Sequence, residues 1–114
     1  MSVPMTALED MLAFQLDALG VPYTREFRAI PGRRFRWDFL IGNSDKSRLL
    51  VEVQGGTWAR ERYGHSTGAG ISRDYAKSNC AQMQGWRTLM FDSKMVKSGE
   101  AARIIQEAYE RQNS

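Results

Sequence analysis

The sequence predicts a single α/β domain in which helices flank a sheet of four strands. Two observations predict this class. Apolar residues recur at helical spacing in some segments, whereas β-branched and aromatic residues concentrate in four short ones. The two kinds of segment follow each other in the order α-β-β-β-α-β-α, without repeats or a linker. The 114 residues suffice for one hydrophobic core, so we expect one domain over residues 1–114.

The first helix is predicted to begin at Thr6. Thr6 and Glu9 have the spacing of a capping box, in which a threonine precedes the helix and a glutamate follows three residues later. Gly20 and Pro22 are signals that end the helix. Five apolar residues share one face of this helix: Leu8, Met11, Leu12, Leu16 and Leu19.

Three strands are predicted next, over residues 23–30, 34–41 and 48–54. Pro31-Gly32 is a turn signal between the first two, so they are expected to form a hairpin. Residues 42–45, with the sequence Gly-Asn-Ser-Asp, form the turn before the third strand.

The two-residue period of a strand predicts which side chains share a face. In the second strand a charged face opposes an aromatic one. The charged face holds Arg34, Arg36 and Asp38, and the aromatic face holds Phe35, Trp37 and Phe39. In the third strand one face holds Leu50, Glu52 and Gln54. We therefore expect a charged surface of arginines that leads up to carboxylates.

The second half of the chain begins with a glycine-rich stretch, followed by a helix over residues 71–84, a strand over 86–91 and a last helix capped by Ser98. The glycine-rich stretch, residues 55–70, has no clear periodicity and is long enough to indicate a functional or disordered loop. In the helix over 71–84, Cys80 aligns with Ala76 and Met83, which predicts a small buried thiol.

The arginines are concentrated in one short segment. Residues 25–36 contain five arginines and one glutamate, in a chain whose net charge is only +3. Such a block favours phosphate-bearing partners. A solvated surface without a partner is the alternative, and charge by itself does not decide between the two.

The few cysteines and histidines exclude other chemistry. Cys80 is the only cysteine, so an internal disulfide and a cysteine-rich zinc site are excluded. His65 is the only histidine, which excludes a zinc site with several histidines. No segment approaches the roughly 20 apolar residues of a membrane span, and the N-terminus lacks a secretion signal pattern. We expect a cytoplasmic protein without a membrane partner.

Asp38 and Glu52 are the most informative residues, because each lies in an apolar run that reads as a buried strand. Burying an ionised carboxylate is costly unless it is paired, hydrogen-bonded or bound to a cation. Oxygen ligands of this kind suit Mg²⁺ or Mn²⁺, which often share their coordination with substrate phosphates. The backbone carbonyl of Val53 is a further candidate ligand. Glu9, at the border of the apolar helical stripe, either completes the metal site or only closes the capping box.

A longer pattern surrounds these residues. Asp38 is followed by E-V-Q-G-G-T-W at residues 52–58, H-S-T-G-A-G at 65–70, D-Y-A-K-S-N at 74–79 and G-W-R at 85–87. The order of elements with D…E-x-Q on strands two and three resembles the PD-(D/E)XK nuclease superfamily. The longer pattern is similar to small phage and bacterial endonuclease-domain proteins related to very-short-patch repair endonucleases, VRR-NUC domains and Holliday-junction resolvases. The resemblance implies a restriction-endonuclease-like αβββαβα core with a central mixed four-stranded sheet.

The resemblance also implies a Mg²⁺- or Mn²⁺-dependent DNA endonuclease, with Asp38 and Glu52 at the metal. Gln54 departs from the superfamily pattern, in which a lysine is common at this place. Glutamine accepts a hydrogen bond from water but carries no charge. In some members the lysine comes from the following helix, and Lys77 is the candidate here. An exposed ion pair between Lys77 and Asp74 is the alternative, and a non-catalytic nucleic-acid-binding module of the same fold also stays open.

The substrate contacts implied by the resemblance lie in the loop and among the arginines. A histidine in this loop lies near the scissile phosphate in the similar proteins, which makes His65 a candidate. The residues expected to bind the phosphate backbone are Arg33, Arg34, Arg36, Arg60, Arg62, His65 and Arg73.

The resemblance to resolvases favours branched or Holliday-junction DNA as the substrate, with sequence-specific or mismatch cleavage as the rival. It also favours a homodimer and a role in repair or recombination in a bacterial or phage-infected cell.

Overall fold

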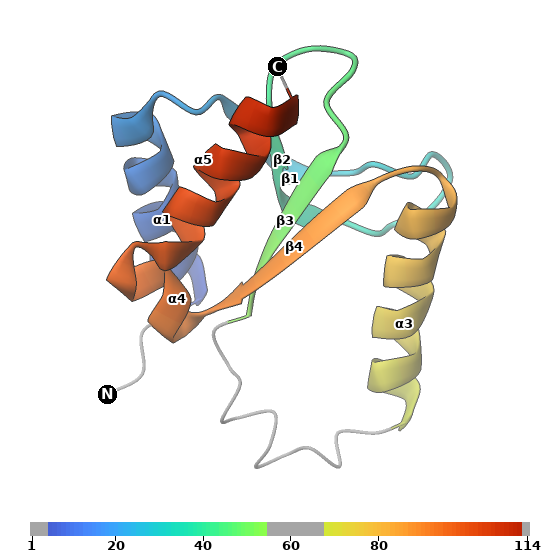
Figure 1. Ribbon diagram of the computed structural model, residues 1–114. Helices are drawn as coiled ribbons and strands as arrows, with labels where there is room; N and C mark the ends of the chain where they lie inside the picture. The colour runs from blue at the N-terminus through green and yellow to red at the C-terminus, as the bar shows by residue number, and fades with distance from the viewer. Residues whose placement is uncertain (1–4, 55–67, 113–114) are drawn as a thin grey trace.

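A mixed four-stranded sheet forms the centre of the chain in the computed structural model, which describes residues 5–54 and 68–112 (Figure 1). The strands lie side by side in the order β1 (Tyr23–Phe27), β2 (Trp37–Ile41), β3 (Leu49–Gln54) and β4 (Arg87–Asp92). β1, β2 and β3 pair antiparallel, whereas β3 and β4 pair parallel. The predicted α/β fold with a mixed sheet is therefore confirmed.

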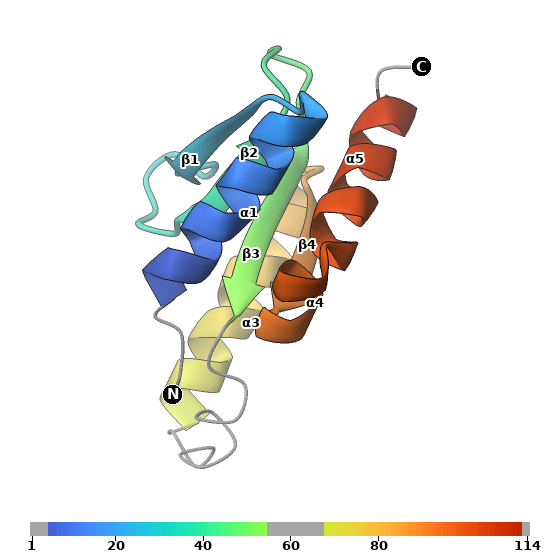
Figure 2. The same ribbon diagram turned by 90° about the vertical axis from the view of Figure 1, so that its left-hand side faces the viewer.

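Helices cover both faces of the sheet. α1 (Met5–Leu19), α4 (Ser93–Ser98) and α5 (Glu100–Gln112) lie on one face, and α3 (Gly68–Met83) lies on the other (Figure 2). α3 lies between β3 and β4 in the chain, which is the kind of long connection that two parallel strands need. In the parts of the chain described, no helix is both long and apolar enough to cross a membrane.

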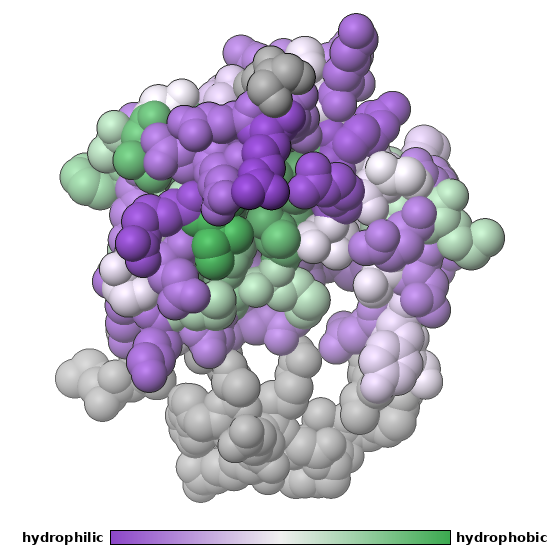
Figure 3. Space-filling model, in the orientation of Figure 1, coloured by the Kyte–Doolittle hydropathy of each residue, from purple (hydrophilic) through white to green (hydrophobic). Residues whose placement is uncertain are grey.

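The larger hydrophobic core lies between the sheet and α1, α4 and α5. Its fully buried members include Leu8, Leu12 and Leu16 of α1, as the helical spacing predicted. They pack with Phe39 and Val51 of the sheet. Figure 3 shows a largely hydrophilic surface on the side seen in Figure 1, with apolar residues gathered where α5 meets β4.

The smaller core lies between the sheet and α3. Its buried residues are Ala29, Ile30, Trp37, Leu50, Ala81 and Trp86. Ala81 is the buried residue that α3 contributes, and Cys80 is only partly buried beside it. The predicted stripe around Cys80 is wrong, since Ala76 and Met83 are exposed. Tyr75 is likewise exposed, so among the described side chains of α3 it is Ala81, and not the predicted stripe, that faces the sheet.

Two predicted boundaries at the N-terminal end differ from the structure. α1 begins at Met5, so Thr6 lies inside the helix and does not precede it as a cap. β1 ends at Phe27 and β2 begins at Trp37, so the predicted hairpin is present but its connection is longer than predicted, over residues 28–36. The predicted turn at Pro31-Gly32 lies within it, where the Arg33 N–H donates a hydrogen bond of 3.2 Å to the Ile30 carbonyl oxygen. Ala29 and Ile30 were predicted to end the first strand. Both side chains are buried in the smaller core, whereas successive residues of a regular strand point to opposite faces.

The C-terminal half contains one helix that the sequence pattern did not predict. α4 is capped by Asp92, whose carboxylate accepts a hydrogen bond of 2.9 Å from the Met95 N–H. Gly99, in the left-handed conformation with φ of 86°, ends it. Ser98 Oγ then accepts a hydrogen bond of 3.3 Å from the Glu100 N–H at the start of α5. Ser98, predicted to cap the last helix, thus contacts the first N–H of α5 but is itself the last residue of α4. α3 begins earlier than predicted, at Gly68.

β1 and β2 change the face that they present to the helices. Arg25 is paired with Phe39, which packs in the larger core beside α1. Phe27 is paired with Trp37, and both pack in the smaller core beside α3. Between these pairs, Glu26 has a positive φ of 53°, which interrupts the regular alternation of a strand. The prediction that Trp37 and Phe39 share one face is therefore wrong.

Candidate active site

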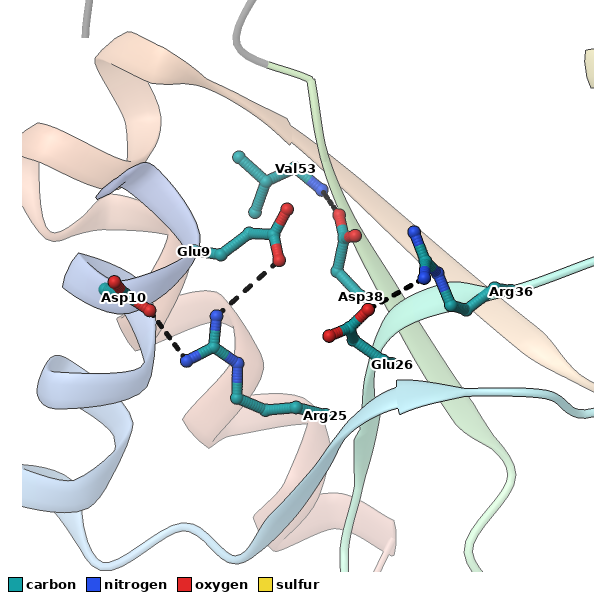
Figure 4. A network of polar contacts seen from close by, with 7 residues as sticks. All are labelled: Glu9, Asp10, Arg25, Glu26, Arg36, Asp38 and Val53. Carbon is teal, nitrogen blue, oxygen red and sulfur yellow. Dashed lines mark hydrogen bonds and ion pairs between the residues drawn. The ribbon is translucent and has the colours of Figure 1, made fainter. Parts of the chain in front are cut away.

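Asp38 lies where β2 separates from β3. The β2–β3 pairing runs from Ile41–Leu49 to Phe39–Val51. Asp38, the residue before Phe39, is therefore the first residue of β2 beyond this pairing. The Val53 N–H donates a hydrogen bond of 2.7 Å to Asp38 Oδ2 (Figure 4). The Asp38 carboxylate thus accepts a hydrogen bond from the Val53 N–H, for which the β2–β3 pairing supplies no backbone acceptor. The hydrogen bond fixes the carboxylate at the end of β3.

Glu52 contacts Lys77 of α3. The Glu52 Oε1 atom accepts a hydrogen bond from the Lys77 ammonium, and the two form an ion pair. The side chains of Lys77 and Glu52 are 18% and 22% exposed, so this pair is largely shielded from solvent. The structure therefore brings the lysine of the following helix to the second strand carboxylate, and Lys77 is not an exposed surface residue.

Two further contacts hold the Lys77 ammonium. Lys77 Nζ donates a hydrogen bond of 2.5 Å to the backbone carbonyl oxygen of Arg36. It also lies 4.8 Å from the centroid of the Trp37 ring, where the negative face of the ring attracts a cation. Trp37 can make this contact because β2 turns it toward α3. A carboxylate, a carbonyl and an aromatic face thus surround one cation.

Glu9 approaches the same end of the sheet from α1. Its side chain is 16% exposed, and its Oε1 atom lies 3.6 Å from Arg25 Nη2. Arg25 Nη1 donates a hydrogen bond of 2.8 Å to Asp10 Oδ1, and its guanidinium lies 5.6 Å from the Phe39 ring centroid. Figure 4 shows the Glu9 and Asp38 side chains extending toward one another from α1 and β2. Arg25, expected on a phosphate-facing surface, pairs with carboxylates of α1 instead.

Burial and mutual repulsion of the carboxylates raise two pKa values. The pKa of Glu9 lies above its ordinary value of 4.5 because of burial first and the charge of Asp38 second, against the opposing effect of Arg25. The pKa of Glu52 is also raised, mainly by burial, while Lys77 lowers it and Asp38 and Asp74 raise it. Asp38 therefore interacts electrostatically with both glutamates. A bound cation would reduce the repulsion between these carboxylates.

Mg²⁺ or Mn²⁺ fits this donor set with two carboxylates. No group of three or more carboxylate, histidine or cysteine side chains converges on a metal position among the residues described. Mg²⁺, however, is usually bound by one or two carboxylates together with waters and substrate phosphates. Asp38, which interacts electrostatically with both Glu9 and Glu52, would supply such a ligand together with one of them, and all these donors are hard oxygen atoms.

A small cavity of about 40 Å³ adjoins Glu52 on the side of α3. It is lined by Trp37, Glu52, Gln54, Asp74, Lys77, Ser78, Thr88 and Met90. A cavity that holds one water needs at least about 10–15 Å³, so this one has room for water. Gln54, the last residue of β3, is placed beside this water-sized space.

The predicted phosphate-binding residues occupy three kinds of position. Arg33 and Arg34 are exposed in the loop over residues 28–36, and the Arg33 guanidinium lies 4.3 Å from the Phe35 ring centroid. Arg36 Nη1 forms an ion pair of 2.8 Å with Glu26 Oε1 (Figure 4). Arg60, Arg62 and His65 lie outside the described residues, and so does the side chain of Arg73.

Several residues of the site were not singled out from the sequence. Glu26 and Asp10 pair with arginines of the block over residues 25–36, and Trp37 contacts Lys77. Glu26 is the lone acidic residue in the arginine block, which is the one local signal that pointed to it. No short-range pattern predicts the contact between Trp37 and Lys77, because it depends on the change of face in β2.

The comparisons with known proteins show a shared fold. No family model matches the sequence, and no curated protein matches it. Among solved structures, the chain is similar to the catalytic domain of the homing endonuclease I-Bth0305I, with a TM-score of 0.67 and 20% sequence identity. The match covers 94% of this chain and 97% of that one. The two chains therefore share a fold over nearly their whole length.

Proposed function

We propose that this domain is a metal-dependent endonuclease of the PD-(D/E)XK type that hydrolyses phosphodiester bonds in DNA. The observation that carries the proposal is the contact of Lys77, from the following helix, with Glu52 of β3, next to the Val53 N–H that binds Asp38 of β2. The likeness of the fold to the catalytic domain of a homing endonuclease supports the same class of reaction.

The chain's own groups have distinct roles in this proposal. Asp38 and Glu52 hold Mg²⁺ or Mn²⁺, with Glu9 and the carbonyl of Val53 as further ligands. When bound, the ion polarises a phosphoryl oxygen and acidifies a water molecule. The Gln54 side-chain oxygen accepts a hydrogen bond from water, and the Lys77 ammonium offsets negative charge that develops on the phosphate.

Substrate binding is assigned to the arginine loop, which we define as residues 28–36. Arg33 and Arg34 are exposed there, and Arg36 follows them just before β2. We assign the phosphate backbone to these three, together with Arg60, Arg62, His65 and Arg73. Branched DNA is the proposed preferred substrate, and a homodimer would bring one site to each strand.

A cleavage assay tests the proposal. The purified protein would be incubated with matched linear, nicked, flapped and four-way DNA in Mg²⁺ or Mn²⁺, beside Glu52→Ala and a metal-free control. Cutting by the wild type that is lost in Glu52→Ala is the expected result, and the preferred substrate defines the subclass. Intact DNA in every reaction with either metal would refute the enzyme. Binding without cutting would identify a nucleic-acid-binding module instead.

A further inference from the structure

The ammonium of Lys77 contacts the Glu52 carboxylate, to which the proposed function assigns the metal. It contacts Glu52 Oε1, donates to the Arg36 carbonyl at 2.5 Å and lies over the Trp37 ring at 4.8 Å. All three contacts attract positive charge. The protein thus supplies an internal cation to the same carboxylate to which the proposed function assigns Mg²⁺ or Mn²⁺.

We propose that Lys77 competes with the divalent metal for Glu52, and that a DNA phosphate relieves this competition by drawing the ammonium away. This inference rests on the proposed function and adds its regulation. Metal binding by the free protein is weakened, and metal binding and DNA binding strengthen each other.

The competition follows from charge and position. A divalent ion coordinated by Glu52 would stand within a few ångströms of the ammonium as it is now placed. Two cations at such a distance repel each other, and the repulsion is only partly screened because both side chains are mostly shielded from solvent. A metal ion therefore either displaces Lys77 from Glu52 or binds with reduced affinity.

The coupling to DNA follows from the second partner of Lys77. The Arg36 carbonyl belongs to the end of the arginine loop, so Lys77 lies next to the proposed phosphate-binding surface. A phosphate oxygen carries negative charge and accepts a stronger hydrogen bond from an ammonium than a neutral carbonyl does. A bound phosphate would thus retain Lys77 nearby while it releases Glu52 for the metal. Linkage requires that the metal then strengthens DNA binding by the same factor.

The first experiment measures metal affinity without DNA. Mn²⁺ would be titrated calorimetrically into the wild type, Lys77→Met and Lys97→Met. Methionine retains a long apolar side chain against Trp37 and removes the charge. Lys97, exposed in α4, is the matched control because its loss changes the net charge equally. Lys77→Met is expected to bind Mn²⁺ about tenfold more tightly than the wild type, which is the order of the Coulomb repulsion in a solvated site. Lys97→Met is expected to match the wild type.

The second experiment measures the coupling in the wild type itself, so it does not depend on the folding of a variant. Ca²⁺, which also takes oxygen ligands, would be titrated with and without a short DNA duplex. The wild type should bind Ca²⁺ several-fold more tightly with DNA, and Lys77→Met should show a smaller gain. Equal or weaker Mn²⁺ binding by Lys77→Met overturns the inference, and so does a wild-type Ca²⁺ affinity that DNA leaves unchanged.

The two proposals fail in different ways. If the wild type cleaves DNA with metal but Lys77→Met shows wild-type metal affinity, the competition is refuted while the nuclease stands. If neither protein binds Mn²⁺ or Ca²⁺ and no DNA is cut, the proposed function itself is refuted, together with the inference that rests on it.

Discussion

Glu26 lies across from Asp38 where β1 and β2 change the face that they present to the helices. The pairs Arg25–Phe39 and Phe27–Trp37 stand on either side of the two residues in the register. Glu26 has a φ of 53°, a conformation that costs a residue other than glycine about 1–3 kcal/mol. The unusual backbone of Glu26 thus lies opposite Asp38, at the end of β2 where its pairing with β3 stops. The backbone conformation of β1 therefore belongs to the structure around Asp38.

The strain at Glu26 leads to a first prediction. Glu26→Gly should be at least as stable as the wild type, because glycine adopts a positive φ without steric conflict. Glu26→Val should lose about 1–2 kcal/mol of unfolding free energy, since a β-branched side chain conflicts with this conformation. Urea denaturation measures both. Glu26→Gln separates the ion pair with Arg36 from the backbone effect and should change stability by no more than about 1 kcal/mol. A valine variant as stable as the wild type would contradict the strain.

A second prediction concerns the two functions of Asp38. Asp38→Asn retains an oxygen that can accept the Val53 N–H, so its stability should stay close to that of the wild type. Asp38→Ala leaves this N–H without its acceptor and should cost about 1–3 kcal/mol. Both variants should lose at least about a hundredfold in metal-dependent cleavage, because neither supplies a carboxylate to the metal. Thermal melting and a cleavage time course distinguish the two functions. Full activity in Asp38→Asn would exclude Asp38 as a metal ligand.

The raised pKa of Glu9 predicts how the stability of the metal-free protein changes with pH. A carboxyl whose folded pKa lies above its unfolded value is unfavourably ionised in the folded state. This destabilisation is fully present above the folded pKa. It is relieved as the pH falls through the folded pKa toward 4.5, because the folded state takes up the proton first. Glu9→Gln removes the charge at every pH.

Glu9→Gln should therefore be more stable than the wild type at pH 7, and the difference should shrink as the pH falls toward 4.5. Chemical denaturation of metal-free protein across this range measures it. Asp10→Asn is the matched control, since it removes the closer partner of Arg25 at an exposed position and should cost at most about 1 kcal/mol. A glutamine variant less stable than the wild type at pH 7 would mean that the ion pair with Arg25 outweighs burial and repulsion.

The sequence predicted the elements well where periodicity is strong. Leu8, Leu12 and Leu16 of α1 are buried because a helix can remove only one face from water, and the 3.6-residue period of this face is visible in the chain. Leu19, predicted to share this face, is exposed at the last residue of the helix. The pairing of β1 with β2 followed from the turn signal at Pro31-Gly32, whereas the mixed four-stranded sheet was implied by the resemblance to the nuclease superfamily. By contrast, α4 is only six residues long, too short to show a period of its own.

The candidate site was predicted in its residue types but not in its contacts. Asp38 and Glu52 were singled out from their positions in apolar strands, and Lys77 from the resemblance to the nuclease superfamily. Their partners depend on tertiary structure: Val53 faces Asp38 only because the ladder ends there, and Trp37 reaches Lys77 only because β2 turns. The prediction that Trp37 and Phe39 share a face assumed that side chains alternate regularly along a strand. The positive φ of Glu26, on the neighbouring strand, interrupts that regularity.

A fourth prediction is that an exposed arginine without an ion pair contributes more to DNA binding than one that is paired with a carboxylate. Arg34 is exposed in the arginine loop and forms no ion pair within residues 5–54 and 68–112, whereas Arg36 is paired with Glu26 at 2.8 Å. A guanidinium that must first leave a carboxylate contributes less to phosphate binding. Arg34→Ala should therefore weaken DNA binding more than Arg36→Ala, and should lower the slope of log affinity against log salt by about one.

Glu26→Gln should have the opposite effect, because it frees Arg36 for phosphate and removes a negative charge from the surface. Fluorescence anisotropy with labelled duplex DNA in Ca²⁺, over a series of salt concentrations, measures these affinities. Arg103→Ala is the matched control, since Arg103 is exposed in α5, on the opposite side of the sheet from α3. An equal loss in Arg103→Ala would show that DNA binding follows net charge alone. Unchanged binding in Arg34→Ala would place the DNA away from the arginine loop.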